Sequence, residues 1–320
     1  MQRIGYMIYE TAEGEKNRGF VSMFAQAGKA YGLRFCLVTK NQYKTSPLPD
    51  FVINRTRDPE VSLFYECHGV LVFHSSDIVR TGNDKAVTLQ KLKEKWSAKI
   101  PLQIPKSTVI DLTQYAVGPA DMTQVSIEDG KKNAFIKLKK EVLKWQDKCG
   151  LMGHNVVLKS VGGHGGSEVF LVSMEEWDEE EKTQEKLQLL LNRKLLCQEW
   201  IDSDSRDIRI YVIGGQPYAA VLRQGFGDFR SNYSLGGSVR EYPLDNMTKE
   251  LVRQYIMALG GSALAFVGVD FLLEKSGCMV FNELEEMVGC RMLYACSDHD
   301  IVSDYVGCAC FFGRRVCRQP

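Results

Sequence analysis

The stretch VGVDFLLEKSGCMVFNELE, residues 267–285, decides the fold that we expect for this chain. It consists of two apolar, β-rich runs separated by a polar break, a pattern that is typical of an antiparallel hairpin. A two-residue loop at Ser276-Gly277 would set the register so that Asp270 lies opposite Glu283. Glu285 would share the face of Glu283, because side chains alternate along a strand.

These three carboxylates predict a metal site. Like charges directly opposite one another destabilise a sheet, so we expect a compensating charge beside Asp270, Glu283 and Glu285. Hard divalent cations such as Mg²⁺ take carboxylate oxygens, and Mn²⁺ is a close substitute. The alternative is a solvated acidic edge with a shifted register, because Ser-Gly is a weaker turn signal than Asn-Gly.

The length and charge of the chain limit the classes of function. Its 320 residues are enough for two or three packed domains with a substantial core. The 40 basic and 40 acidic residues balance, which gives no support to nucleic-acid or membrane binding as the main task. No segment has the roughly 18 uncharged apolar residues that a membrane span needs. The ten scattered cysteines indicate reduced, buried thiols in a cytoplasmic protein.

The first 80 residues alternate strand and helix signals, which predicts a small α/β domain with a parallel sheet. Its strands are expected at IGYMIYE, RFCLVT, DFVINRT and VLVFHSS, with helices over residues 17–31 and after Pro59. A further helix is expected over residues 83–96 with Asn83 as its N-cap. Residues 101–123 carry proline and glycine punctuation, so we expect a connector there.

The rest of the chain has an α+β pattern with long antiparallel hairpins. Strands are expected at NVVLKS, SEVFLVS, KLLCQEWI, and in a hairpin of DIRIYVI with QPYAAVLR that turns at Gly214-Gly215. Helices are expected over residues 131–149, 175–192 and 248–259, and from about residue 297, where Ser297-Asp298 would cap the last helix.

The loop Gly162-Gly163-His164-Gly165-Gly166 has four glycines in five positions. A plain turn needs one or two, so the excess indicates a backbone that approaches a ligand closely. The N–H groups of such a loop suit phosphate oxygens. The loop lacks the Lys-Ser/Thr ending of a P-loop and does not open a helix. The alternative is a flexible surface turn, with His164 as a polar loop residue rather than a catalytic base.

Two lysines suit phosphate binding, although each taken alone is more commonly an ordinary exposed side chain. Lys159 ends the strand before the glycine loop, where its ammonium would lie beside the same phosphates. Lys85 opens a helix, which is the unfavourable end of the dipole for a cation. Gln198-Glu199-Trp200-Ile201 puts polar groups into an apolar strand, where an adenine edge or an intradomain hydrogen bond would satisfy them.

Three arginines and an amide follow in the next hairpins. Arg209, Arg223 and Arg230, with Asn232, suit a transferring phosphoryl group or an acyl phosphate. Each of them alone is more commonly a surface residue. Arg55 and Arg57, after the strand DFVIN, are candidates to grip a substrate carboxylate with paired N–H groups.

Taken in order, these motifs resemble the ATP-grasp superfamily, and within it RimK-like amino-acid ligases and glutathione synthetases. The motifs are VVLKSVGGHGG, QEWI, DIRIYVIGG, LRQGFGDFRSNYSLGGS and GVDFLLEKSGCMVFNELE. The resemblance covers about residues 70–289 and implies an α+β ATP-grasp fold, in which two subdomains hold ATP between them. It implies an α/β pre-ATP-grasp domain at residues 1–80 and an ATP-grasp domain at residues 81–320. The latter has a lid-like part at about 110–200 and a C-terminal part at about 201–320.

The resemblance also implies roles for single residues. Those near nucleotide phosphates are Lys85, Lys159, Gly163, His164, Gly165 and Gly166; those around adenine are Gln198, Glu199, Trp200 and Ile201, with Asp207 near the ribose. Those that meet the γ-phosphate or acyl phosphate are Arg223, Arg230 and Asn232, and the magnesium ligands are Asp270, Glu283 and Glu285. One position departs from the family, because Glu285 stands where asparagine is usual.

The activity that the resemblance implies is that of an ATP-dependent carboxylate–amine ligase. A substrate carboxylate attacks the γ-phosphorus of ATP, and an amine then displaces phosphate from the acyl phosphate. The expected cofactors are ATP and Mg²⁺, and the expected substrates are small-molecule or peptide carboxylates and amines. Two alternatives stay open, a phosphotransferase acting on a hydroxyl and a nucleotide-binding regulatory protein without turnover. The sequence also leaves a homo-oligomer open.

Overall fold

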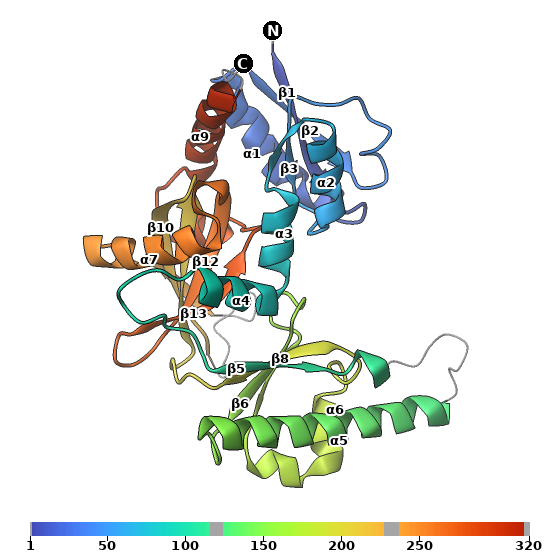
Figure 1. Cartoon of the computed structure of the whole chain (residues 1–320). Coiled ribbons are helices and arrows are strands. Elements are labelled where there is room, and N and C mark those ends of the chain that lie inside the picture. The colour runs from blue at the N-terminus through green and yellow to red at the C-terminus, as the bar shows by residue number, and fades with distance from the viewer. Residues whose placement is uncertain (1, 116–123, 227–236, 317–320) are drawn as a thin grey trace.

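The structure of the protein, a computed structural model, describes residues 2–115, 124–226 and 237–316. Three β-sheets follow one another along the chain and lie one above the other in Figure 1. The parallel N-terminal sheet is at the top, the central antiparallel sheet is in the middle, and a second antiparallel sheet with two helices is at the bottom. The N-terminal and central sheets lie within predicted segments, whereas the lower sheet begins at Ser107, before the predicted start at about 110. The boundaries between the segments stay predictions.

The N-terminal sheet has the strand order β2-β1-β3-β4, and all its pairs are parallel. Its elements are β1 (Arg3–Tyr9), α1 (Arg18–Lys29), β2 (Leu33–Thr39), β3 (Phe51–Asn54), α2 (Pro59–Cys67) and β4 (Leu71–Phe73). Met7 and Ile8 in β1 are fully buried, as expected for a parallel strand that is covered on both faces. The predicted α/β character of the first 80 residues is confirmed.

Two helices, α3 (Ser76–Asn83) and α4 (Lys85–Lys95), connect this sheet to the rest of the chain. The prediction that Asn83 caps a helix is wrong, because Asn83 ends α3. Asp84 caps α4, and its carboxylate accepts hydrogen bonds from the backbone N–H groups of Ala86 and Val87 at 2.8 and 3.0 Å. Aspartate and asparagine are equally good N-caps, so the sequence alone does not separate these neighbours.

The lower sheet has the order β5-β8-β6-β7 and is antiparallel. Its elements are β5 (Ser107–Asp111), α5 (Gln124–Cys149), β6 (Val156–Ser160), β7 (Val169–Val172), α6 (Glu180–Lys186) and β8 (Lys194–Glu199). Helices α5 and α6 lie together below the sheet in Figure 1. The strand β5 lies inside the segment predicted as a connector, where its pairing with β8 outweighs the surrounding proline and glycine punctuation.

The single helix predicted over residues 175–192 is wrong. A 3-10 turn at Glu175–Asp178 precedes the short α6, and turns follow it. Trp177 is buried in the core of this part of the protein, and the Thr183 hydroxyl donates to the Glu176 carbonyl, a side-chain bond of the kind that competes with a regular helix. Leu187, Leu190 and Leu191, predicted to share one side, are all buried in the same core.

The central sheet has the order β11-β10-β9-β12-β13. Its elements are β9 (Arg206–Ile213), β10 (Gln216–Gln224), β11 (Ser238–Glu241), α7 (Asn246–Leu259), β12 (Phe266–Leu273), β13 (Met279–Glu285), α8 (Arg291–Cys296) and α9 (Ile301–Val316). The turn at Gly214-Gly215 is confirmed. The last helix begins at Ile301 rather than at the predicted Ser297-Asp298 cap, because the short α8 precedes it.

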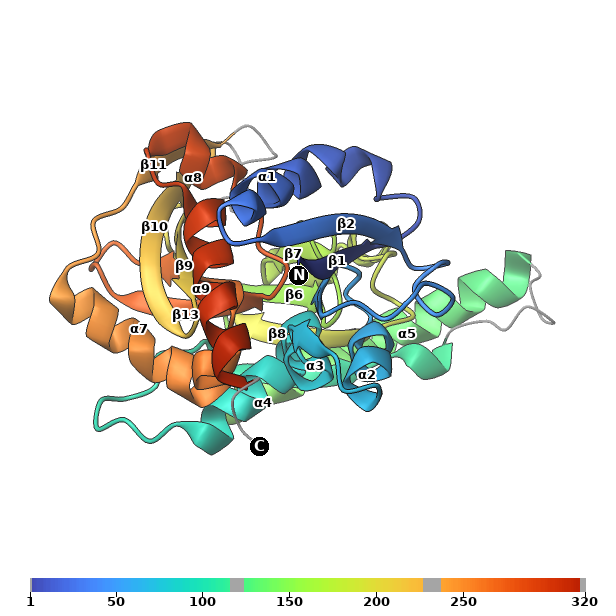
Figure 2. The same cartoon turned by 90° about the horizontal axis from the view of Figure 1, so that it is seen from above.

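The two faces of the central sheet belong to different cores. Along β9, Ile208, Ile210 and Val212 pack in the same cluster as residues of α7, whereas Tyr211 packs with the N-terminal domain and α9. Figure 2 shows α9 running between α1 and the central sheet. Because side chains alternate along a strand, Arg209 shares the Tyr211 face and is directed toward the N-terminal domain.

The β12–β13 hairpin brings Asp270 opposite Glu283, as predicted, but by a different route. The loop has three residues rather than two, since Glu274 and Cys278 still share a backbone hydrogen bond and Gly277 adopts a positive φ of 86°. This shifts the register near the loop by one residue. A β-bulge at Asn282 shifts it back, because Phe271 pairs with Phe281 whereas Asp270 pairs with Glu283.

Two further predictions concern thiols and membrane segments. The eight cysteines whose side chains the structure describes are free, but only Cys197 and Cys290 of these are buried, so the prediction of buried thiols is correct for these two. Among the helices that the structure describes, none combines the length and apolar character that crossing a bilayer would require.

The packing of the N-terminal sheet predicts opposite effects for two Gly→Ala changes. A Cβ at Gly5 would lie 2.2 Å from ring atoms of Phe51, and overpacking of this kind costs about 1–3 kcal/mol. Gly19 in α1 has open space around it, and alanine favours a helix over glycine by about 1 kcal/mol. We expect G5A to lower the thermal midpoint followed by circular dichroism and G19A to raise it. Equal midpoints for the two variants would contradict the packing described here.

Candidate functional site

A cavity of about 1000 Å³ lies between the three sheets and receives side chains from all of them. Most of the predicted site residues line it: Lys85, Lys159, Gly163, Gly165, Gly166, Gln198, Glu199, Trp200, Ile201, Asp207, Arg223, Glu283 and Glu285. His164 and Asp270 are described by the structure but do not line the cavity. Arg230 and Asn232 lie outside the described residues. Most of the site residues that the sequence predicted therefore lie around one cavity.

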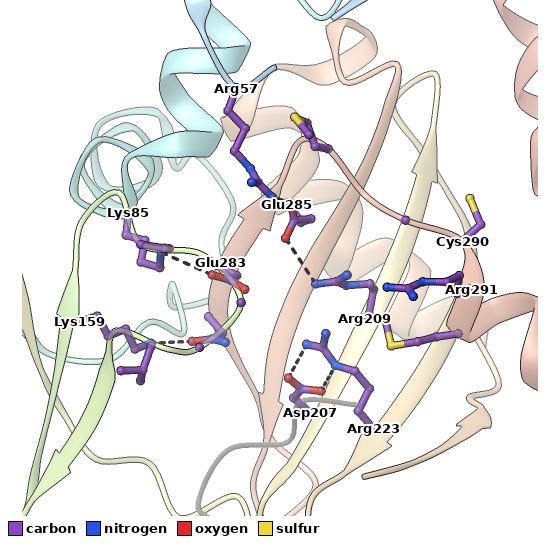
Figure 3. A pocket seen from close by; sticks show the side chains of 18 of the residues that line it. Arg57, Lys85, Lys159, Asp207, Arg209, Arg223, Glu283, Glu285, Cys290 and Arg291 are labelled. Carbon is purple, nitrogen blue, oxygen red and sulfur yellow. Dashed lines mark hydrogen bonds and ion pairs between the residues drawn. The ribbon is translucent and has the colours of Figure 1, made fainter. Parts of the chain in front are cut away.

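One end of the cavity carries two buried lysines beside the glycine loop. Lys85 Nζ donates to the Gly163 carbonyl and lies 3.9 Å from a Glu283 oxygen. Lys159 Nζ donates to Asn282 Oδ1 at 2.8 Å, and Figure 3 shows both lysines directed toward β13. Burial lowers the pKa of Lys159 to about 8, Glu283 opposes this shift and Lys85 adds to it. The ammonium groups of Lys85 and Lys159 thus lie at the same end of the cavity as the glycine loop.

Asn282 is a site residue that the sequence reasoning missed. In a regular strand Asn282 and Glu283 would point to opposite faces, but the bulge at Asn282 breaks this alternation and both residues line the cavity. Bulges re-aim side chains in this way and are common beside functional sites. The signal that could have found it is the polar pair Asn-Glu inside an otherwise apolar strand.

The end of β8 and the two residues after it form a recess at another side of the cavity, with polar and apolar side chains in its wall. Gln198 is 2% exposed, and its Nε2 has no hydrogen-bond partner among the residues that the structure describes. A buried amide without a partner costs about 1–3 kcal/mol, so a bound group with an acceptor would be favoured here. Trp200 and Ile201 add apolar surface to this recess. An adenine ring, which has both a flat apolar face and acceptor nitrogens, fits this set.

The adjacent strands β10, β9 and β12 of the central sheet carry a buried network of two aspartates and two arginines. Arg209 Nε and Nη2 donate to the two Asp270 oxygens at 2.8 and 2.7 Å, and Arg223 Nη2 donates to Asp270 at 2.7 Å. Arg223 also donates twice to Asp207. Burial alone would raise the pKa of Asp270, but the two arginines outweigh it and lower the pKa to about 2. All four side chains are under 10% exposed.

This network changes the roles expected for its members. Both oxygens of Asp270 are occupied by arginines, and the Asp207 oxygens, expected near a ribose, accept from Arg223. Arg209, which the sequence analysis noted without assigning it to the site, binds both oxygens of Asp270, and Arg223 joins the two aspartates. Gly268 makes room for it, because a Cβ there would come within 3.3 Å of Arg209 Cδ and Nε.

The three-carboxylate set predicted for magnesium does not fit a metal centre as it stands. Asp270 is fully buried and outside the cavity lining, and Glu285 lies near Arg57 and Arg209. Across the described residues, no group of three His, Cys, Asp or Glu side chains could hold a metal ion. Glu283 remains as a carboxylate in the cavity wall, and burial, with Asp270 nearby, raises its pKa.

The remaining cations of the cavity differ in their partners. Arg55 donates to the carbonyls of Met287 and Val288 at 2.9 and 3.3 Å, so it fixes the loop after β13 instead of presenting paired N–H groups to a substrate. Arg291, at the start of α8, is exposed, lines the cavity and has no ion pair among the described residues. Burial, with Arg57 and Lys85 nearby, lowers the pKa of His164 to about 4, so it is neutral near pH 7.

Comparison with known families identifies this arrangement. A sequence model of the RimK-like ATP-grasp domain matches residues 122–306, more than half of the chain. The chain belongs to the RimK-like ATP-grasp family. The fold and family that the sequence motifs resembled are therefore confirmed.

Curated relatives of this RimK-like protein match part of their own length. N-acetylaspartylglutamate synthase A of Homo sapiens is 33% identical over 145 residues, which cover 45% of this chain and 35% of the synthase. The probable alpha-L-glutamate ligase of Haemophilus influenzae is 30% identical over 169 residues, which cover 50% of this chain and 52% of the ligase. The chain thus spans about half or less of these relatives.

Solved structures of ATP-grasp ligases share the fold over almost the whole chain. The D-cycloserine synthetase DcsG has a TM-score of 0.68 at 13% identity, with 97% of this chain and 99% of that chain covered. The ATP-grasp ligase PsnB, in complex with a precursor variant, Mg and ADP, has a TM-score of 0.62 at 15% identity, with 97% and 98% covered. At these identities the likeness shows the fold alone.

The buried network predicts that Asp270 is essential for stability. D270N would leave Arg209 and Arg223 short of a negative charge, and removing one partner of a buried ion pair costs about 3–5 kcal/mol. A matched control is D202N, because Asp202 forms an exposed pair with Lys275, and exposed pairs contribute about 1 kcal/mol or less. We expect a much larger fall in thermal midpoint for D270N. Equal midpoints for the two variants would show that the network is not needed for stability.

Proposed function

We propose that this protein is an ATP-dependent ligase that joins a carboxylate to an amine through an acyl phosphate. The observation that carries the proposal is that one cavity collects a recess with an unsatisfied amide, a glycine loop, two buried lysines and the carboxylate of Glu283. The names of the relatives, a synthase and a glutamate ligase, support an amide-forming activity on amino-acid or peptide substrates. The free cysteines support a cytoplasmic location.

ATP is proposed to lie with its adenine against Gln198–Ile201 and its phosphates against the glycine loop. The unpartnered Gln198 Nε2 would donate to an acceptor of the ring, and Lys85 and Lys159 would contact the phosphate oxygens. Lys85 already contacts the Gly163 carbonyl, so phosphate binding would also fix the loop over the nucleotide. Closure of such a loop excludes water that could otherwise hydrolyse an acyl phosphate.

Magnesium, or manganese in its place, is proposed to accompany the nucleotide. Mg²⁺ is usually held by one or two carboxylates together with substrate phosphates, so the protein need not supply a full ligand set. Glu283 lines the cavity beside Lys85 and Lys159 and is the residue that we propose to face the metal. When bound, the ion would neutralise charge on the phosphates.

The other end of the cavity is proposed to hold the carboxylate and amine substrates. It is lined by residues of the N-terminal domain and of the loop and helix after β13, including Glu10, Glu13, Arg291 and Tyr294. Arg209 and Arg223 are oriented by Asp270 and Asp207, which would hold their charges toward the phosphoryl group during transfer. The alternative to amide formation is transfer of the phosphoryl group to a substrate hydroxyl, which the same residues of the cavity would allow.

The proposal is tested by measuring ADP release over paired carboxylates and amines, with mass spectrometry of the products. We expect ADP release that requires both a carboxylate and an amine, with an amide and free phosphate as products. E283Q should reduce the rate at least about 100-fold if Glu283 faces the metal, whereas the exposed control variant E60Q should match the wild type. A phosphorylated product would indicate a phosphotransferase, and nucleotide binding without turnover would indicate a regulatory protein.

The pKa of Lys159 predicts how nucleotide binding depends on pH. Since burial lowers this pKa to about 8, the ammonium charge is present below that pH and is lost as the pH rises through it. ADP affinity, measured by calorimetry between about pH 7 and pH 9, should therefore fall with increasing pH. K159R keeps its charge throughout this range and should flatten the dependence. The same slope in both proteins would contradict the phosphate role of Lys159.

A further inference from the structure

Glu285, the residue that departs from the usual family pattern, lies between two arginines. One of its oxygens is 3.8 Å from Arg57 Nη2 and the other is 3.9 Å from Arg209 Nη2. Figure 3 shows the carboxylate between these two guanidinium groups. The Glu285 side chain is 18% exposed, that of Arg57 is 39% exposed and that of Arg209 is 9% exposed, so water and salt screen the pair with Arg57 more than the pair with Arg209.

Glu285 and Glu283 differ in the positively charged residues that lie near them. Asp207, Asp270 and Glu285 each have an arginine as their cationic neighbour. Glu283 has lysines instead, and these are the lysines beside the glycine loop. Three carboxylates are thus matched by arginines of the protein, and only Glu283 among these four faces the end of the cavity where phosphates would bring a cation.

Arg57 lies in the loop after β3 of the N-terminal sheet, whereas Glu285 ends β13 of the central sheet. A second contact joins the same two segments. Arg57 follows β3 in the N-terminal domain, and its backbone has a φ of 60°, a left-handed conformation that bulky residues rarely adopt. Asn83 Nδ2 lies 3.1 Å from the Arg57 carbonyl and 2.9 Å from Glu286 Oε1. The unusual backbone of Arg57 is therefore tied to the end of β13 at the place where its side chain reaches Glu285.

We propose that Glu285 is a positioning residue that holds the N-terminal domain against the central sheet through Arg57, and that it is not a metal ligand. A neutral asparagine at this position could not balance the charge of Arg57, whereas glutamate does. The pair fixes the wall of the cavity between the glycine loop and the substrate end. The part of this inference that concerns the metal rests on the proposed nucleotide function, and the part that concerns the ion pair does not.

The ion pair is tested by a double-mutant cycle on the full chain. E285Q is isosteric and removes only the charge, and R57Q removes the partner. We expect each variant to lower the thermal midpoint and the double variant to melt with E285Q, because the two changes remove the same interaction. Amide hydrogen exchange around residues 55–58 should become faster in both single variants. The exposed pair Arg80–Glu60 gives a control cycle, in which R80Q and E60Q should change the midpoint little.

The inference that Glu285 is not a metal ligand is tested by comparing E285Q with E283Q. The measured quantity is the factor by which Mg²⁺ raises the affinity for ADP in calorimetry. We expect E285Q to keep this factor within about twofold of the wild type, and E283Q to lower it about tenfold or more. A loss in E285Q equal to that in E283Q would overturn the inference, and so would additive midpoint shifts in the double-mutant cycle. A wild-type protein that does not bind ADP would instead contradict the proposed function, while the stability cycle would still decide the role of the ion pair.

Discussion

Asp270 carries a negative charge at a point in the central sheet that water does not reach, and two arginines from neighbouring strands surround it. A buried charge is tolerated only when its partners satisfy it closely, and losing one partner is far more costly than losing a surface pair. Because Asp270, Arg209 and Arg223 come from β12, β9 and β10, this requirement fixes three adjacent strands relative to one another. It also fixes the wall of the cavity, since both arginines line it.

The carboxylates of the acidic hairpin therefore have different roles on its two strands. On β12, Asp270 accepts hydrogen bonds from Arg209 and Arg223 of the neighbouring strands. On the edge strand β13, the bulge turns Asn282 and Glu283 together into the cavity, where Asn282 holds Lys159 and Glu283 lies near Lys85. A single inserted residue thus brings Asn282 and Glu283 of the central sheet to Lys159 of the lower sheet and Lys85 of α4. This connection forms part of the cavity wall, because Lys85, Lys159, Asn282 and Glu283 all line the cavity.

The parts of this arrangement that the sequence predicted are those set by local pattern and by the order of motifs. The apolar runs around residues 267–285 placed Asp270 opposite Glu283 correctly, although the loop is longer than expected and a bulge compensates for it. Turn length depends on the backbone conformation of Gly277, which composition does not reveal. The convergence of the lysines on the glycine loop followed from the resemblance, because each lysine alone is an unremarkable residue.

The partners of charged residues could not be read from the sequence in the same way. A carboxylate in an apolar strand needs a cation, but a metal ion and an arginine satisfy that need equally well as far as the pattern shows. For Asp270 and Asp207 the partner is arginine, and Arg209 comes from a strand 61 residues away in the chain. The strand β5 and the broken helix after Glu175 were missed for a related reason, since tertiary packing there outweighs local propensity.

The most direct measurement is a crystal structure of the protein with ADP and Mg²⁺ bound. The account predicts adenine against Gln198–Ile201, phosphates on Lys85 and Lys159, and the metal beside Glu283, with Asp270 still bonded to Arg209 and Arg223. A metal ion bound by Asp270 and Glu285, with the arginines displaced, would contradict it, as would a nucleotide bound outside this cavity.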